Sequence, residues 1–266
     1  MKNEVVQSTI FITKRKMFLN LFDDDYDIWK TFSFKNFWKN EILKIQIYPM
    51  LKKTGTTIVG LTFLDGVILA ADTRATNGDI VCDSDCDKIH FISKNISCCG
   101  AGTSADTENI TKMISEQIEL KRLFSEREST VQSAVSMCTK ILYQSQGLIS
   151  AALIMGGFDS SGGQLYAIYP HGSVENLPFI SMGSGSLAAM SLLENFYCDY
   201  MELRVALDII KESILAGIYN DLGSGGNVDI CIITKQSIQL IRSNFSRTSP
   251  KIFSKYKSIK KFIMTF

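Results

Sequence analysis

A strand-like pattern of hydrophobic and polar residues begins at Thr56 and does not extend into the residues before it. The runs "TTIVGLTFL" and "GVILAADTR" are rich in strand-forming residues and meet at Asp65-Gly66, a dipeptide that favours a tight hairpin turn. The runs "KIHFIS" and "ISCCGAG" predict a second hairpin around Lys94-Asn95. From Thr56 onward the chain is therefore expected to begin with two pairs of antiparallel strands.

Apolar residues at spacings of three and four predict four helices. The first helix is expected to start near Ser104 and the second at about Ser129. The third and fourth are expected to cover roughly residues 186–197 and 202–219. Further strands are predicted for "ISAALIMGGFD", "QLYAIYP", "VENLPFISMG" and, over 228–234, "VDICIIT". This order differs from the strict strand–helix alternation of a doubly wound fold. An α+β fold suits it better, with two antiparallel sheets face to face and a helix pair on each outer side.

Asp72 is expected close to Thr56, where the first hairpin begins and ends. Pairing across the predicted turn puts Asp72 opposite Val59, roughly 10 Å from Thr56 along the sheet. Strict alternation would put the Asp72 side chain on the other face from Thr56, and one bulge would reverse that. The pattern thus predicts that the two residues are near each other, but not that they touch.

The two ends of the chain differ from the part between them. Residues 1–55 are rich in aromatic residues and lysine, hold both tryptophans, and show no sustained alternation or heptad. These residues could bind a membrane surface, bind a partner or form a pro-segment, and their pattern does not decide among these roles. Residues 56–236 form the expected domain, and a basic tail, residues 237–266, follows it.

Composition describes an ordinary globular chain with a core. Of its 266 residues, 45% are hydrophobic and 21% are charged, and the formal net charge is +1. We therefore expect neither nucleic acid nor an anionic membrane as a partner. No apolar run approaches the roughly 20 residues of a membrane span. The early Glu4 and the interrupted apolar patch in "MKNEVVQSTIFITKRK" argue against a secretory signal.

Cysteine and histidine narrow the possible chemistry. The seven cysteines do not repeat at zinc-ligand spacing, so we expect reduced thiols of a cytosolic protein. His90 and His171 are the two histidines of the sequence. A histidine-based metal site or a Ser/His/Asp triad therefore has almost no candidates.

A set of motifs runs in order from Thr54 to about Lys235: "TGTTIVG", "ADTRAT", "DKIHFIS", "CCGAGTSADTE", "YPHGS", "MGSGSLAAM" and "GIYNDLGSGGNVD". Together they resemble the catalytic beta subunits of the proteasome, and within that family the trypsin-like class. The resemblance fails over residues 1–50 and is loose in the tail. It implies an N-terminal nucleophile hydrolase, whose fold is a four-layer α-β-β-α sandwich.

The resemblance also implies that the chain cuts itself between Gly55 and Thr56. Residues 1–55 would then be a propeptide, and the freed α-amine of Thr56 would act as the base for its own hydroxyl. An α-amine has a pKa of roughly 7.7–8.0, which suits base work at neutral pH better than the roughly 10.4 of lysine. Before the cut this nitrogen is an amide, so the enzyme is off.

The remaining catalytic roles come from the resemblance, residue by residue. Lys88 would lie beside Thr56 and lower the pKa of its amine and hydroxyl, and Asp72 would hold Lys88 ionised and oriented. Gly102 would offer its backbone N–H to the tetrahedral oxyanion. An outer ring that fixes Thr56 and assists autolysis would comprise Ser184, Asp221 and Ser224. The glycine-rich runs "GSGS" and "GSGG" lack the spacing and lysine of a P-loop.

Matching positions also imply a pocket for a basic side chain. Gly100 has no side chain and would leave the pocket deep, and Glu108 would be a desolvated acid at its floor. Cys86 and His90 would line the pocket, Asp83 would belong to the adjoining subsite, and Asp85 and Asp87 would add negative charge nearby.

The expected function is that of a threonine endopeptidase that cleaves unfolded polypeptides after basic residues, without a metal or nucleotide in this subunit. The resemblance implies a ring of seven different beta subunits, flanked by alpha rings, in the cytoplasm and nucleus. The tail 237–266 is expected to reach a neighbouring subunit.

Three alternatives remain open. The chain could be a structural, uncleaved ring subunit, although such subunits usually lack the threonine or the lysine. It could be a small-molecule amidase of the same fold. A serine hydrolase based on Ser184 is disfavoured because a suitable histidine is missing.

Overall fold

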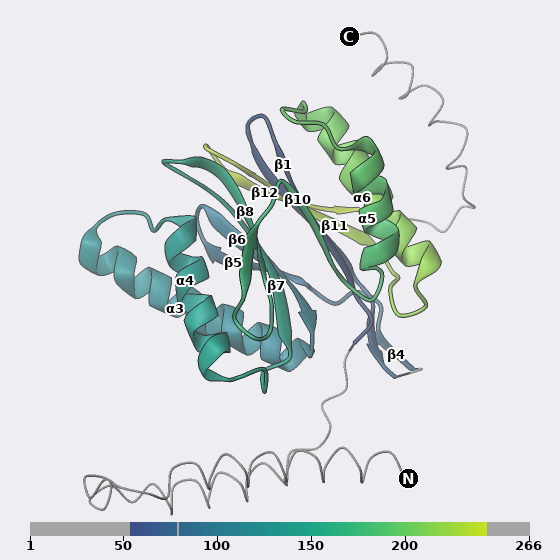
Figure 1. Cartoon of the computed structure of the whole chain (residues 1–266), viewed down its shortest axis with the longest axis horizontal. Coiled ribbons are helices and arrows are strands. Elements are labelled where there is room, and N and C mark those ends of the chain that lie inside the picture. The colour runs from purple at the N-terminus through teal and green to yellow at the C-terminus, as the bar shows by residue number, and fades with distance from the viewer. Residues whose placement is uncertain (1–53, 79, 244–266) are drawn as a thin grey trace, which may run out of the picture. The chain divides into compact units, whose positions relative to one another are not determined.

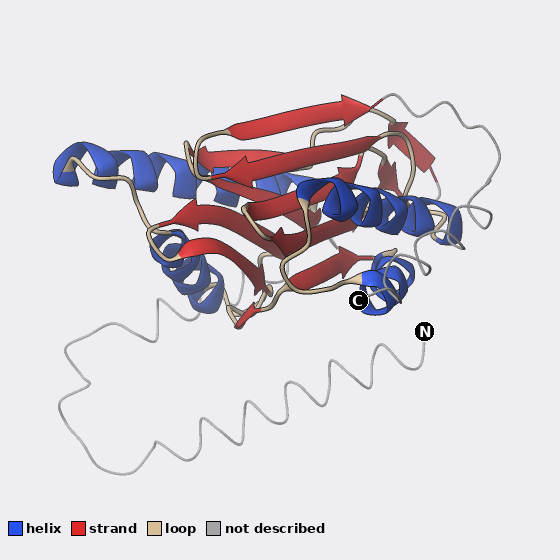
Figure 2. Cartoon of the chain, turned by 90° about the horizontal axis from the view of Figure 1, so that it is seen from above, coloured by secondary structure: helices blue, strands red, loops and turns tan. Residues whose placement is uncertain are grey.

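The protein is represented by a computed structural model that describes residues 54–78 and 80–243 (Figure 1). Two five-stranded antiparallel sheets lie face to face, and a pair of helices covers the outer face of each sheet. Figure 2 shows the same elements from above, with the helices alongside the strands. The predicted four-layer α+β sandwich is confirmed. Residues 1–53 of the predicted propeptide and 244–266 of the predicted tail lie outside the described residues.

The first sheet contains β1 (Thr57–Phe63), β2 (Gly66–Asp72), β10 (Phe179–Gly183), β11 (Val228–Thr234) and β12 (Ile238–Ser243). Its strand order is β10-β1-β2-β11-β12, so the predicted first hairpin lies near its centre. Almost every residue of β1 and β2 is buried, because helices cover one face of the sheet and the second sheet covers the other.

The second sheet contains β5 (Ile89–Ser93), β6 (Ile96–Gly102), β7 (Ala151–Asp159), β8 (Gly162–Ile168) and β9 (Val174–Asn176). These strands are ordered as they occur in the chain, so each pairs with its sequence neighbour. A separate small hairpin consists of β3 (Ala75–Asn77) and β4 (Ile80–Asp83). It follows β2 directly and carries the chain toward the second sheet.

The four predicted helices are α3 (Ser104–Ser125), α4 (Val131–Gln144), α5 (Ser186–Phe196) and α6 (Leu203–Asn220). In Figure 1, α3 and α4 lie against the second sheet, and α5 and α6 lie against the first. The helix predicted from about Ser129 begins two residues later, because Thr130 caps it: the Thr130 hydroxyl accepts a hydrogen bond from the Ser133 N–H.

Three hydrophobic clusters hold the four layers together. The cluster between the sheets includes Ile58, Leu69 and Ile154, all fully buried. Each outer cluster joins one sheet to its helix pair, with Ile114 representative of one and Ile210 of the other. Burial of such side chains contributes roughly 1.5–3 kcal/mol each, which makes the two-sheet platform a firm support for residues at its edges.

One predicted strand was wrong. The run "VENLPFISMG" forms two strands in different sheets, because β9 pairs with β8 whereas β10 pairs with β1. Pro178 lies between them and lacks the N–H that a continuous ladder would need. The chain passes from one sheet to the other at this point, and it thereby brings the end of β10 beside the start of β1.

Candidate active site

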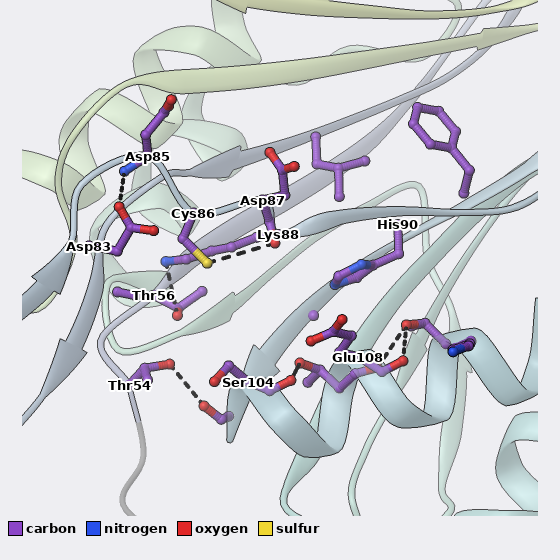
Figure 3. Close-up of a pocket in the computed structure, with 18 of the residues that line it drawn as sticks. Thr54, Thr56, Asp83, Asp85, Cys86, Asp87, Lys88, His90, Ser104 and Glu108 are labelled. Carbon is purple, nitrogen blue, oxygen red and sulfur yellow. Dashed lines mark hydrogen bonds between the residues drawn. The ribbon is translucent and has the colours of Figure 1, made fainter.

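Three side chains from separate segments meet where β1 begins. The Lys88 ammonium donates hydrogen bonds to Asp72 Oδ1 at 2.7 Å and to Thr56 Oγ1 at 3.1 Å. Thr56, Asp72 and Lys88 are 2%, 0% and 7% exposed. Figure 3 shows Lys88 reaching along the cavity wall toward the Thr56 hydroxyl. Strand spacing predicted that Asp72 lies near Thr56, and the structure shows that Lys88 contacts both residues.

The register of the first hairpin corrects the sequence prediction. Val59 pairs with Ala70, so by the same register Asp72 lies opposite Thr57 rather than opposite Val59. The Thr57 N–H donates to Asp72 Oδ1 at 2.9 Å. No bulge occurs between β1 and β2. Asp72 and Thr56 are linked instead by the long side chain of Lys88, which reaches both.

The buried Asp72 carboxylate has a hydrogen-bond partner for each oxygen. Besides Lys88 and Thr57 on Oδ1, the backbone N–H groups of Gly225 and Arg74 donate to Oδ2 at 3.0 and 3.4 Å. Burial lowers the pKa of Lys88 below its ordinary value, and the charge of Asp72 opposes this shift in part. The pair is thus a rigid, hydrogen-bonded unit rather than an isolated ammonium group.

The carbonyl oxygen of Gly55 accepts hydrogen bonds from both the Thr56 hydroxyl and the Lys88 ammonium. The Thr56 hydroxyl donates to Gly55 O at 2.7 Å, and Lys88 Nζ donates to the same oxygen at 3.3 Å. The Gly55 N–H donates to Thr76 Oγ1 at 2.9 Å, which fixes the other side of this residue. A Cβ at position 55 would lie 2.3 Å from the Gly223 backbone, so this close approach requires glycine.

A second cluster surrounds the Thr56 nitrogen. The Thr56 N–H donates to Ser184 Oγ at 3.1 Å, and the hydroxyls of Ser184 and Ser224 donate to Asp221 Oδ2 at 2.5 and 2.6 Å. Burial alone would raise the pKa of Asp221, but these hydrogen bonds outweigh it and hold the pKa below its ordinary value. Ser224 touches the hydroxyl of Thr57 at 2.6 Å, so its contact with Thr56 is indirect.

Gly102 and Thr54 bound the site on the side of the second sheet. Gly102 has a φ of +123°, and a Cβ there would lie 2.2 Å from Ser150 O, so the position requires glycine. Its carbonyl accepts hydrogen bonds from the Thr54 N–H at 3.3 Å and from the Thr54 hydroxyl at 2.9 Å. Thr54, two residues before Thr56, is therefore bound to the end of β6 through both its backbone and its side chain.

A cavity of about 820 Å³ extends from Thr56 between β5 and α3. Its size is within the range of small-molecule binding pockets, roughly 300–1,000 Å³. Figure 3 shows Asp83, Asp85, Cys86 and Asp87 along one wall and Glu108 on α3 across from them. The four residues predicted for the pocket line it, Cys86, His90, Gly100 and Glu108, and so does Asp83, which was predicted for the adjoining subsite.

Two features of this cavity differ from the expectation. A desolvated acid was predicted, but the Glu108 side chain is exposed, and none of the residues 54–78 and 80–243 desolvates it. A Cβ at Gly100 would lie 2.8 Å from the Cβ of Thr107, so this glycine allows α3 to approach β6 closely.

Burial lowers the pKa of His90, and the charge of Glu108 opposes this shift. Burial raises the pKa of Cys86, and the charge of Lys88 opposes that shift. Both groups are therefore held toward their neutral forms.

Several residues at the site were not found by sequence reasoning. The Thr76 hydroxyl accepts from the Gly55 N–H beside the expected cut, and the Thr54 hydroxyl donates to the Gly102 carbonyl. Thr76 lies in β3, whose three residues are too few for alternation to signal such a role. Leu240 and Arg242 line the cavity from β12, a strand that the sequence analysis did not predict. A correct hairpin register would have identified Thr57, because it is the residue opposite Asp72.

Within residues 54–78 and 80–243, no group of three or more His, Cys, Asp or Glu side chains is arranged to hold a metal ion. In the same part of the chain no helix is long and apolar enough to cross a membrane.

Comparison with known proteins agrees with this geometry. A family model described as proteasome subunit matches residues 52–233. "Proteasome subunit beta type-7-A" of Arabidopsis thaliana is 53% identical over 205 residues, which cover 77% of this chain and 75% of that protein. "Proteasome subunit beta type-10" of Bos taurus is 47% identical over 82% of each chain. "Probable proteasome subunit beta type-2" of Schizosaccharomyces pombe is 47% identical over 78% of each.

Proposed function

The chain belongs to the proteasome subunit family, among its beta subunits, and from this premise we propose that it is a threonine endopeptidase that cleaves polypeptides after basic residues. The observation that carries the proposal is the position of the Lys88 ammonium. It contacts the Thr56 hydroxyl and the Gly55 carbonyl while it is paired with the buried Asp72. This arrangement supplies a nucleophile, an acyl carbon and a cation together.

Maturation is the first reaction of this site. Thr56 Oγ1 attacks the carbonyl carbon of Gly55, the C–N bond breaks, and the hydroxyl proton ends on the departing nitrogen of Thr56. The product is an ester between Gly55 and Thr56 together with a free α-amine. Water then hydrolyses the ester, which releases the Gly55 carboxylate and restores the Thr56 hydroxyl. Lys88, 3.3 Å from Gly55 O, stabilises the negative charge that develops on that oxygen.

Peptide hydrolysis then repeats the same acyl transfer on a substrate. The freed amine of Thr56 accepts the hydroxyl proton, Oγ1 attacks the substrate carbonyl carbon, and the proton passes to the leaving amine. An ester forms on Thr56, and water hydrolyses it. Ser184 and Asp221 hold the nitrogen in place, and the Gly102 N–H is our candidate donor to the oxyanion.

Preference for a basic residue is attributed to Glu108. This carboxylate lines the cavity across from Cys86, and the acids of the opposite wall add to the negative potential. Charge pairing with arginine or lysine would be strengthened once the substrate, or a neighbouring subunit, covers Glu108. Hydrogen bonds to charged groups contribute roughly 1.5–3 kcal/mol, which corresponds to about 10- to 100-fold in selectivity.

Replacing Glu108 with glutamine tests this assignment. We expect E108Q to lower kcat/KM for arginine-ended fluorogenic peptides by about 10- to 100-fold, because a charged acceptor is replaced by a neutral one. The matched control is E119Q on the same helix: Glu119 pairs with Arg122 away from the cavity and should leave turnover unchanged. Equal losses in the two variants would contradict the pocket assignment.

The proposal as a whole is tested by the intact mass of the chain purified from the working particle. We expect a chain that starts at Thr56. A chain that retains Gly55 would support the rival of an uncleaved structural subunit, because its nitrogen would still be an amide. Cleavage of arginine-ended but not leucine-ended peptides would separate the protease from an amidase of the same fold.

The wider setting is part of the same proposal. We propose that the chain occupies a ring of seven different beta subunits stacked against alpha rings, in the cytoplasm and nucleus. Its substrates would be unfolded polypeptides. The relatives named as proteasome subunits support the assembly, and the basic residues beyond Ser243 are the candidate contact with a neighbour.

A further inference from the structure

The cavity has a wall that the proposed chemistry does not use, strand β12. Leu240 and Arg242 are two residues apart on this strand and both line the cavity. Side chains two apart on a strand point to the same face. Arg242 pairs with Asp229 of β11 in the sheet register, so the edge of the first sheet adds a cation beside the cavity.

Arg242 joins two carboxylates. Its Nη2 atom forms an ion pair with Asp87 Oδ1, and its Nε atom lies 3.8 Å from Asp229 Oδ2. Asp87 and Arg242 are 62% and 47% exposed, whereas the Asp229 side chain is 6% exposed. The guanidinium thus connects an exposed acid of the cavity wall with a buried acid at the end of β11. Asp87 directly precedes Lys88, so this contact lies one residue from the proposed catalytic machinery.

The cavity lining carries more acidic than basic side chains, and its cations are Lys88, Lys112 and Arg242. Asp83 and Asp85 lie on the same wall as Asp87, and Glu108 lies across from them (Figure 3). Burial, with a smaller contribution from the charge of Asp85, raises the pKa of Asp229 to about 6. Lys88 is paired with the buried Asp72, so these two residues together add no net charge to the wall.

We infer that Arg242 is a specificity-determining residue: its guanidinium neutralises Asp87 and thereby reduces the negative charge of the cavity wall that faces Glu108 and a basic substrate side chain. The inference rests on the proposed function, because it concerns how strongly a basic side chain is bound. Asp87 and Arg242 together add no net charge to the cavity wall. Loss of one partner therefore changes the charge seen by the substrate by one unit, in a direction that depends on which partner is lost.

Charge-changing variants in the assembled particle test this inference. With an arginine-ended fluorogenic peptide, R242Q should lower KM by about two- to fivefold, because it leaves Asp87 unpaired and free to attract the substrate. D87N should raise KM by a similar factor, because it removes one negative charge from the cavity wall and leaves Arg242 with the buried Asp229 as its remaining acid. The double variant should return KM to the wild-type value. The changes should appear in KM rather than in kcat, since neither side chain touches Thr56.

Ionic strength and matched controls distinguish this role from a structural one. Charge effects between exposed groups should shrink as salt is raised, because screening shortens their range. R242K keeps the positive charge and should keep KM near the wild-type value. R122Q removes an arginine of α3 that pairs with Glu119 outside the cavity, and it should not change KM.

Two results would overturn the inference. One is a D87N/R242Q double variant with the same KM as R242Q, because the charge balance between the two residues would then not decide substrate binding. The other is an R242Q particle with raised KM and lowered kcat at every salt concentration. Arg242 would then support the structure of the site and not set its charge. A wild-type particle that fails to cleave arginine-ended peptides would instead refute the proposed function itself.

Discussion

Thr56→Ala is expected to leave the chain uncut after Gly55 and to lower turnover of arginine-ended peptides by at least about 10⁴-fold. The variant removes the hydroxyl that lies 2.7 Å from Gly55 O and 3.1 Å from Lys88 Nζ. Without it neither the maturation ester nor the substrate ester can form. Intact mass of the chain and peptide turnover by the assembled particle measure the two effects separately.

Two control substitutions, one at Thr56 and one at Thr57, test whether the Thr56→Ala result is due to the Thr56 hydroxyl. Thr56→Ser keeps a hydroxyl and should retain both cleavage and turnover. Thr57→Val removes the adjacent hydroxyl, which contacts Ser224 rather than the Gly55 carbonyl, and should still permit cleavage at Gly55. Undiminished turnover by Thr56→Ala would show that another group is the nucleophile.

Lys88→Ala is expected to have the second-largest effect. Lys88 has a proposed role in the reaction at Thr56, and its ion pair with Asp72 also stabilises the fold. Its ammonium contacts Thr56 Oγ1 and Gly55 O, so its loss should lower turnover by about 10²- to 10⁴-fold. It also leaves Asp72, which is fully buried, without its counter-charge. Breaking a buried ion pair in this way typically costs about 3–5 kcal/mol in the free energy of unfolding. Chemical denaturation and peptide kinetics of the same variant report the two losses.

A double variant separates catalysis from stability. Asp72→Asn combined with Lys88→Met removes both charges, while the single asparagine oxygen can accept either from the Thr57 N–H or from the Gly225 N–H, but not from both. We expect only part of the lost stability to return and turnover to stay low. Recovery of turnover in this double variant would mean that Lys88 acts only by supporting the fold.

Much of the architecture follows from local pattern. The four helices and most strands appear where apolar spacing predicts them, because one face of each element must be buried in this layered fold. The first hairpin illustrates the limit of such reasoning. Its strands were identified, but the turn forms at Leu64-Asp65 instead of Asp65-Gly66, and the pairing shifts by two residues. A shift of two keeps every side chain on its predicted face, so periodicity alone could not detect it.

From the sequence alone came the family, through its ordered motifs, and the proposal of a threonine nucleophile, through the scarcity of histidine and the threonine that follows glycine where the domain begins. Tertiary structure decided which groups touch. Lys88 meets Thr56 and Asp72, and Arg242 meets Asp87, through contacts between segments far apart in the chain. Local periodicity reports which face of an element is buried, whereas these contacts depend on how two sheets and their connecting loops pack in space.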